Sequence, residues 1–145
     1  MRKGTIVSIC ISSEKGMKKT PVQSALFCAD HGIEGDAHAG QWHRQVSLLA
    51  EESIESMRTK GFDVGYGDFA ENITTRGLVL YEIPVGTKIR IGESLIEVTQ
   101  IGKECHDRCA VYYAAGDCVM PRQGIFARVL RGGKVKKGDE IFVED

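Results

Sequence analysis

The stretch TKIRIGESLIEVTQI, residues 87–101, decides the fold class of this chain. Polar and apolar residues alternate over 87–91 and again over 95–101, which is the period of a half-buried β-strand. Gly92 and Glu93 separate the two runs, and a two-residue connection that contains glycine suits a tight hairpin. The stretch therefore predicts two antiparallel strands.

Working outward, short apolar segments punctuated by many of the 17 glycines predict further strands. Residues 51–60 predict a helix, since glutamates come early, basic residues come late and Gly61 follows. No strand–helix–strand rhythm repeats. We therefore expect one mainly β domain over 1–145, a barrel with about two short helices. The expected strands are 4–11, 22–29, 44–49, 71–75, 78–83, 124–130 and 139–143, and the second helix is 107–115.

Composition narrows the function classes. The formal net charge is −1, from 19 basic and 20 acidic side chains, so bulk charge gives no reason to expect nucleic acid or an anionic membrane as partner. The apolar run at 6–11 is too short to span a bilayer. Five cysteines in no regular framework indicate a reducing compartment. We expect a cytoplasmic protein.

A thiol cluster is the first candidate site. Cys105 and His106 precede the predicted helix at 107–115, Cys109 lies within it, and Cys118 follows. A thiol near a helix N-terminus and beside basic groups has a lowered pKa, which suits a nucleophile or a persulfide carrier. Buried cysteines that act as small apolar residues are the alternative. A zinc site is a second alternative, although the spacing of these cysteines and the histidine matches no standard zinc-ligand pattern.

Two polar blocks lie earlier in the chain. Asp36 and His38 stand in the glycine-rich segment 32–40 and would share one face of an extended chain. Asp36 could equally hydrogen-bond its own turn. Asn72 could contact a ligand or bond its own backbone. Trp42 is predicted to pack in the core or at a corner rather than to serve as a stacking platform.

Positive charge gathers late in the chain. Residues 101–138 carry eight basic side chains against three acidic ones, while 28–72 carry nine acids against three bases. Arg122 and Arg128 could each hold a phosphate or carboxylate in two places. Solvated faces of opposite sign explain the same pattern without a ligand.

Taken together, the blocks resemble the MOSC domain, the C-terminal module of molybdenum cofactor sulfurases. The resemblance implies a closed β-barrel over nearly the whole chain. The matching segments are 32–40, 44–49, 67–75, 85–101, 124–133 and 137–139.

The resemblance also implies site residues. It assigns the family's cysteine to Cys105, although Glu104 replaces a common proline, and Cys118 competes as the reactive thiol. With His106 these thiols form the predicted catalytic group, and no side chain is predicted as a metal ligand. Residues expected to bind the molybdenum cofactor, with its phosphate near the last three, are Asp36, His38, Arg44, Asn72, Lys103, Arg122, Arg128 and Arg131.

Three functions follow from the resemblance. The first is a sulfur carrier or cofactor-binding module that works with cofactor-biosynthesis enzymes and a recipient molybdoenzyme. The second is a non-catalytic adaptor or chaperone for the cofactor. The third is molybdenum-dependent reduction of N-hydroxylated compounds. Pyridoxal phosphate is not expected, because 145 residues leave no room for the sulfurase domain that uses it.

Overall fold

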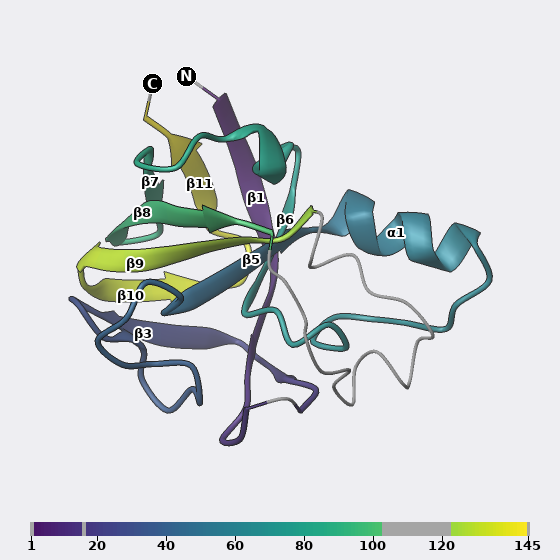
Figure 1. Cartoon of the computed structure of the whole chain (residues 1–145), viewed down its shortest axis with the longest axis horizontal. Helices are drawn as coiled ribbons and strands as arrows, with labels where there is room; N and C mark the ends of the chain where they lie inside the picture. Colours follow the sequence, from purple (N-terminus) through teal and green to yellow (C-terminus); the bar gives the residue numbers. More distant parts are fainter. Residues whose placement is uncertain (1, 16, 103–122, 145) are drawn as a thin grey trace.

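The computed structural model describes residues 2–15, 17–102 and 123–144, and its strands close into a barrel (Figure 1). Around the ring the order is β11, β7, β8, β9, β5, β6 and β1, and the pairing of β1 with β11 closes it. The two ends of the chain therefore lie side by side, with Arg2 opposite Val143. The predicted mainly β, closed-barrel fold is confirmed. The ring strands are β1 (Arg2–Ile11), β5 (Val46–Ala50), β6 (Ile73–Arg76), β7 (Lys88–Ile91), β8 (Ser94–Ile101), β9 (Ile125–Arg131) and β11 (Glu140–Val143).

The hairpin predicted from residues 87–101 is present. Strands β7 and β8 are antiparallel, with Lys88 opposite Glu97 and Ile91 opposite Ser94. Gly92 turns the chain with a φ of 55°, a conformation that favours glycine. The buried positions of β7 alternate with exposed ones, as the sequence pattern requires.

A small second sheet lies beside the barrel, in the order β10, β3 and β4. Its strands are β10 (Gly133–Lys136), β3 (Ser24–Cys28) and β4 (Gly32–Ile33), while β2 (Thr20–Val22) pairs with β1. The strand expected at 22–29 is present as β3, but Val22 belongs to β2, because the chain breaks at Gln23 and the two strands join different sheets. Strand β10 was not predicted, since Gly132 and Gly133 indicated only a turn.

The segment 78–83 is a further correction. A strand was expected, but the chain forms the 3-10 turn η1 (Leu80–Glu82). Leu80 and Ile83 are both fully buried. Two apolar residues three positions apart suit a tight helical turn as well as a short strand, so the sequence pattern did not separate the two.

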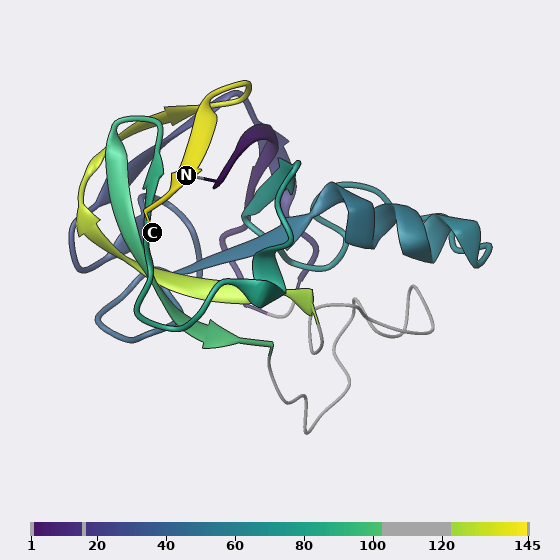
Figure 2. The same ribbon diagram turned by 90° about the horizontal axis from the view of Figure 1, so that it is seen from above.

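The helix predicted at 51–60 is α1 (Glu51–Thr59), which follows β5 directly and extends away from the barrel (Figure 2). Gly61 follows it with a φ of 96°, as expected of a residue that ends a helix. Ile54 and Met57 pack with Phe69 and Phe126 in a small second core. The helix predicted at 107–115 lies outside the described residues.

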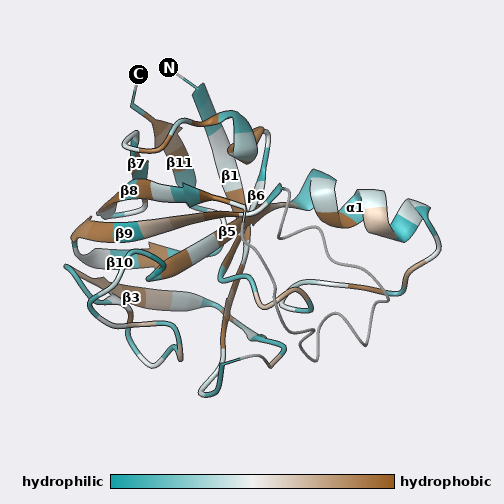
Figure 3. Ribbon diagram, viewed as in Figure 1, coloured by the Kyte–Doolittle hydropathy of each residue, from teal (hydrophilic) through white to brown (hydrophobic). Residues whose placement is uncertain are grey.

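The main core fills the barrel, and apolar residues concentrate on its strands (Figure 3). Strand β5 is buried at all five positions, because one side lines the barrel and Leu49 on the other joins the second core. Buried polar side chains accompany this apolar core where β1 ends and β5 and β6 begin. They include Ser8, Lys19, Asp36, Ser47, Glu71, Asn72 and Thr74.

Candidate functional site

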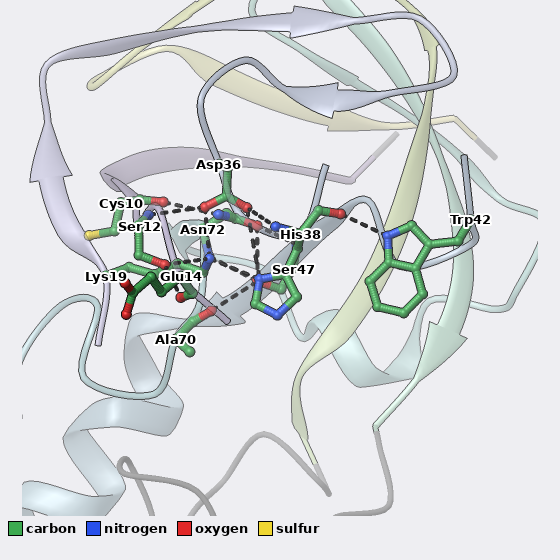
Figure 4. Close-up of polar contacts among 10 residues, drawn as sticks. All are labelled: Cys10, Ser12, Glu14, Lys19, Asp36, His38, Trp42, Ser47, Ala70 and Asn72. Carbon is green, nitrogen blue, oxygen red and sulfur yellow. Dashed lines mark hydrogen bonds and ion pairs between the residues drawn. The ribbon is translucent and has the colours of Figure 1, made fainter. Parts of the chain in front are cut away.

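A buried ion pair between Lys19 and Asp36 forms the centre of the polar cluster (Figure 4). Lys19 precedes β2, and Asp36 follows β4. The Lys19 Nζ lies 2.7 Å from the Asp36 Oδ1, and both side chains are 0% exposed. Removing two charges from water is costly, so such a pair persists only where further hydrogen bonds complete it.

Those further bonds are present. The backbone N–H of Ser12 donates to Asp36 Oδ1 at 3.1 Å, and the N–H of His38 donates to Oδ2 at 3.1 Å. Asp36 therefore does bond its own turn, as one of the two sequence interpretations held. It also holds Lys19, which neither interpretation included.

His38 joins the pair through its ring. Its Nδ1 lies 3.0 Å from Lys19 Nζ, and 23% of its side chain is exposed. The carbonyl of His38 accepts a 2.7 Å hydrogen bond from the indole Nε1 of Trp42. Asp36 and His38 are thus in contact, but through a turn and not along one face of an extended chain, and Trp42 adjoins them.

Two positively charged side chains lie near the ring of Trp42. The Lys15 Nζ lies 5.0 Å from the ring centroid, and the Arg44 guanidinium carbon lies 4.8 Å from it. Arg44 also lies over Phe126, at 5.7 Å. Its Nε is buried without a hydrogen-bond partner in the part of the chain that the structure describes. A buried guanidinium nitrogen without a partner is costly, which makes Arg44 a candidate for binding an external acceptor.

Asn72 is engaged by protein groups. Its Oδ1 accepts from the backbone N–H of Ser47 at 3.0 Å and from the Ser47 hydroxyl at 3.2 Å. Its Nδ2 donates to the carbonyl of Cys10 at 3.0 Å. These bonds tie the ends of β1, β5 and β6 together. These hydrogen bonds explain why an asparagine is buried at this position without any contact to a ligand.

Glu71 lies next to Asn72 and is 0% exposed. Its carboxylate accepts hydrogen bonds from the backbone N–H groups of Gly67 and Phe69, at 2.9 and 3.1 Å. Burial raises the pKa of Glu71 to about 7, against the lowering effect of these donors. The carbonyl of Gly67 in turn accepts from the N–H of Lys19, so this carboxyl group supports the loop that holds the lysine.

The arginines predicted near the cofactor do not all come together. Arg128 is half exposed, 3.6 Å from Glu97. It lines an open cavity of about 430 Å³ beside Trp42. Arg131 is exposed three residues further along β9, beside the turn to β10, and does not line that cavity. The full lining is Asp30, Gln41, Trp42, His43, Glu97, Thr99 and Arg128.

Two cysteines, Cys10 and Cys28, lie in the described part of the chain. Cys10 is fully buried, and this burial raises its pKa to about 11, so it is a poor nucleophile. Cys28 is a partly buried free cysteine. Among the described residues, no three His, Cys, Asp or Glu side chains gather as a metal site. The predicted residues Lys103, Cys105, His106, Cys109, Cys118 and Arg122 lie outside the described residues.

Lys19 was not among the residues predicted from the sequence. It stands in the run Lys18-Lys19-Thr20, where nothing separates a buried lysine from a solvated one. Only the fold brings Lys19, just before β2, next to Asp36. Lys15 was missed for the same reason, because its neighbour Trp42 lies 27 positions away.

The MOSC domain family model matches residues 35–142, most of the chain. This chain belongs to the MOSC domain family. That family includes the C-terminal domain of molybdenum cofactor sulfurases and is associated with the molybdenum cofactor. The match includes Asp36, His38 and Arg44, while Lys19 lies before it.

Individual relatives extend the comparison. The uncharacterized protein YflK of Bacillus subtilis is 26% identical over 141 residues, and this chain spans 62% of its length. The YuaD structure from B. subtilis matches with a TM-score of 0.80 and 20% identity, covering 96% of this chain and 94% of that one. YiiM of Geobacillus stearothermophilus matches with a TM-score of 0.73 and 20% identity, covering 98% and 75%. The two structural matches support the barrel fold.

No helix in the ranges 2–15, 17–102 and 123–144 is long and apolar enough to cross a membrane.

Proposed function

We propose that this MOSC domain binds the molybdenum cofactor through the anionic end of its pterin, at the face formed by Lys15, His38, Trp42 and Arg44. The observation that carries the proposal is Arg44, a guanidinium held between two aromatic rings with a buried Nε that has no partner among the described residues. Guanidinium groups bind phosphate in a bidentate, charge-assisted manner.

The donor set fits such a ligand. Lys15 and Arg44 supply positive charge, and Asp36 is already neutralised by its 2.7 Å ion pair with Lys19. A phosphate would thus meet these two cations, and Asp36 would not repel it. When bound, the cofactor would supply a molybdenum centre able to take up sulfur. We further propose that Cys105 carries sulfur for that centre.

The test is the amount of cofactor that the protein retains. The chain is produced in cells that make the molybdenum cofactor and in cells that do not, then purified and oxidised, and pterin fluorescence is measured per mole of protein. We expect pterin only from the first cells. Loss of a charge-assisted hydrogen bond costs about 1.5–3 kcal/mol, so Arg44→Gln should weaken retention by roughly tenfold or more.

Arg90→Gln is the matched control. Arg90 lies on β7 and is half exposed, with an ion pair to Glu144, so its loss should leave pterin retention unchanged. An absence of pterin from the wild-type protein would contradict the proposal. Cys105→Ser then separates two roles. A sulfur carrier would keep its bound pterin but lose its biological activity, whereas a non-catalytic adaptor would keep both the pterin and the activity.

A further inference from the structure

The Lys19 ammonium has three hydrogen-bond donors, and three acceptors surround it. Asp36 Oδ1 lies at 2.7 Å, His38 Nδ1 at 3.0 Å and Ser12 Oγ at 3.4 Å. The Ser12 hydroxyl donates its own proton to the carbonyl of Glu14, at 2.9 Å, so toward Lys19 it acts as an acceptor. A lysine ammonium donates only. The arrangement is complete only if His38 Nδ1 accepts as well.

We propose that Lys19 fixes His38, one of the residues of the proposed cofactor face, as the neutral tautomer with its proton on Nε2 and none on Nδ1. The ring cannot carry a proton on Nδ1 without directing it at an ammonium group 3.0 Å away. Asp36 does not reverse this outcome, because its nearer oxygen to that ring nitrogen is 3.9 Å away.

The surroundings strengthen the constraint. Lys19 and Asp36 are both 0% exposed, so little water screens the repulsion between an ammonium and an imidazolium. The ring is fixed from other directions as well, since the His38 N–H bonds Asp36 Oδ2 and the His38 carbonyl accepts from Trp42. Figure 4 shows the ring between Lys19 and Trp42. Lys19 is thus a positioning residue for His38.

Nitrogen NMR of the ligand-free protein tests the tautomer directly. Histidine is labelled with ¹⁵N, and the signal of His38 is assigned by its disappearance in His38→Gln. At neutral pH we expect a pyridine-type shift for Nδ1 and a pyrrole-type shift for Nε2. A protonated Nδ1, in either the other tautomer or an imidazolium, overturns the inference. This measurement on the wild-type protein does not depend on the folding of any variant.

A double variant tests the cause. Lys19→Met with Asp36→Asn removes both charges together and keeps one amide oxygen as acceptor, for either the Ser12 or the His38 N–H group. Without the ammonium, we expect Nδ1 to become partly protonated. An unchanged Nε2–H preference in the folded double variant would show that Lys19 does not set the tautomer.

Discussion

A buried lysine is the residue on which this site depends. The Lys19 side chain is 0% exposed, and its charge is tolerated because Asp36 is 2.7 Å away and two further acceptors complete its shell. Such a pair adds little net stability compared with apolar packing. Breaking it is costly, because the remaining charge keeps its desolvation penalty and loses its partner.

Lys19→Met should therefore destabilise the protein by about 3–5 kcal/mol, the range for an uncompensated buried charge. Urea unfolding monitored by fluorescence measures this free energy. The matched control is Lys18→Met, because Lys18 is half exposed and its nearest carboxylate oxygen, on Asp68, lies 3.9 Å away. That exposed pair should contribute no more than about 1 kcal/mol. Equal losses at both positions would mean that Lys19 is not buried as described.

Glu71 gives the fold a pH dependence. Its pKa is about 7 in the folded protein, raised by burial from the usual 4.5. A raised folded pKa means that the folded state favours the protonated form, so its contribution to stability is full below about 4.5 and is lost as the pH rises through 7. Between pH 5 and 8 the wild type should lose about 2–3 kcal/mol relative to Glu71→Gln.

Urea unfolding at several pH values measures this difference. The glutamine variant should be less stable throughout, since its amide NH₂ faces a backbone donor, but its stability should change less with pH. Other titrating groups are common to both proteins and cancel in the comparison. Parallel pH profiles for the two proteins would refute a titrating Glu71.

Local chemistry made part of the site predictable. Asp36 and His38 follow one another at a spacing of two in a glycine-rich turn, and they do act together. Lys19 and Ser12 flank the turn between β1 and β2, and they meet Asp36 and His38 only through contacts 17 to 24 positions apart in the sequence. No short-range signal encodes that meeting. The thiols predicted to be reactive lie outside the described residues, so their roles stay predictions.

At the scale of elements, the loop at 65–71 supports the site through Gly67. This glycine has a φ of 86°, and a Cβ there would overlap the carbonyl oxygen of Lys19. Gly67→Ala combines backbone strain with a clash against backbone, so we expect a loss of more than about 3 kcal/mol. Gly65→Ala is the control, because a Cβ there would meet only the Arg58 Nη2, at 4.0 Å. A loss at Gly67 no larger than at Gly65 would contradict this close contact.

The elements also show which sequence patterns suffice. The β7–β8 hairpin was predictable because alternation and a turn glycine agree. The turn η1 was not, since Leu80 and Ile83 are buried in a short apolar run whose period is ambiguous. Strand β10 was missed because it begins at Gly133 immediately after the turn, and its pairing with β3 is settled by contacts over a hundred residues apart.

At the scale of the whole molecule, one pairing closes the barrel. Strand β11 bonds β1 on one side and β7 on the other, and Ile141 and Val143 are both 0% exposed in the core. Without β11, the ring becomes an open sheet with β1 and β7 as edges. Edge strands with unpaired backbone groups promote association with other chains.

Removing residues 140–145 should therefore abolish the cooperative unfolding transition and leave a protein that aggregates. The deletion removes two buried aliphatic side chains and the backbone hydrogen bonds of β11 to both β1 and β7. Calorimetry and light scattering measure the two effects. Removing only residues 144–145 is the control, since it spares every paired residue of β11 and takes from the described chain only the Glu144 N–H bond to Lys88 and the ion pair to Arg90. That shorter deletion should cost no more than about 1–2 kcal/mol, the worth of one hydrogen bond and one exposed ion pair. A longer deletion that still unfolded cooperatively, with a midpoint near that of the shorter one, would mean that the barrel is held together without its closing strand.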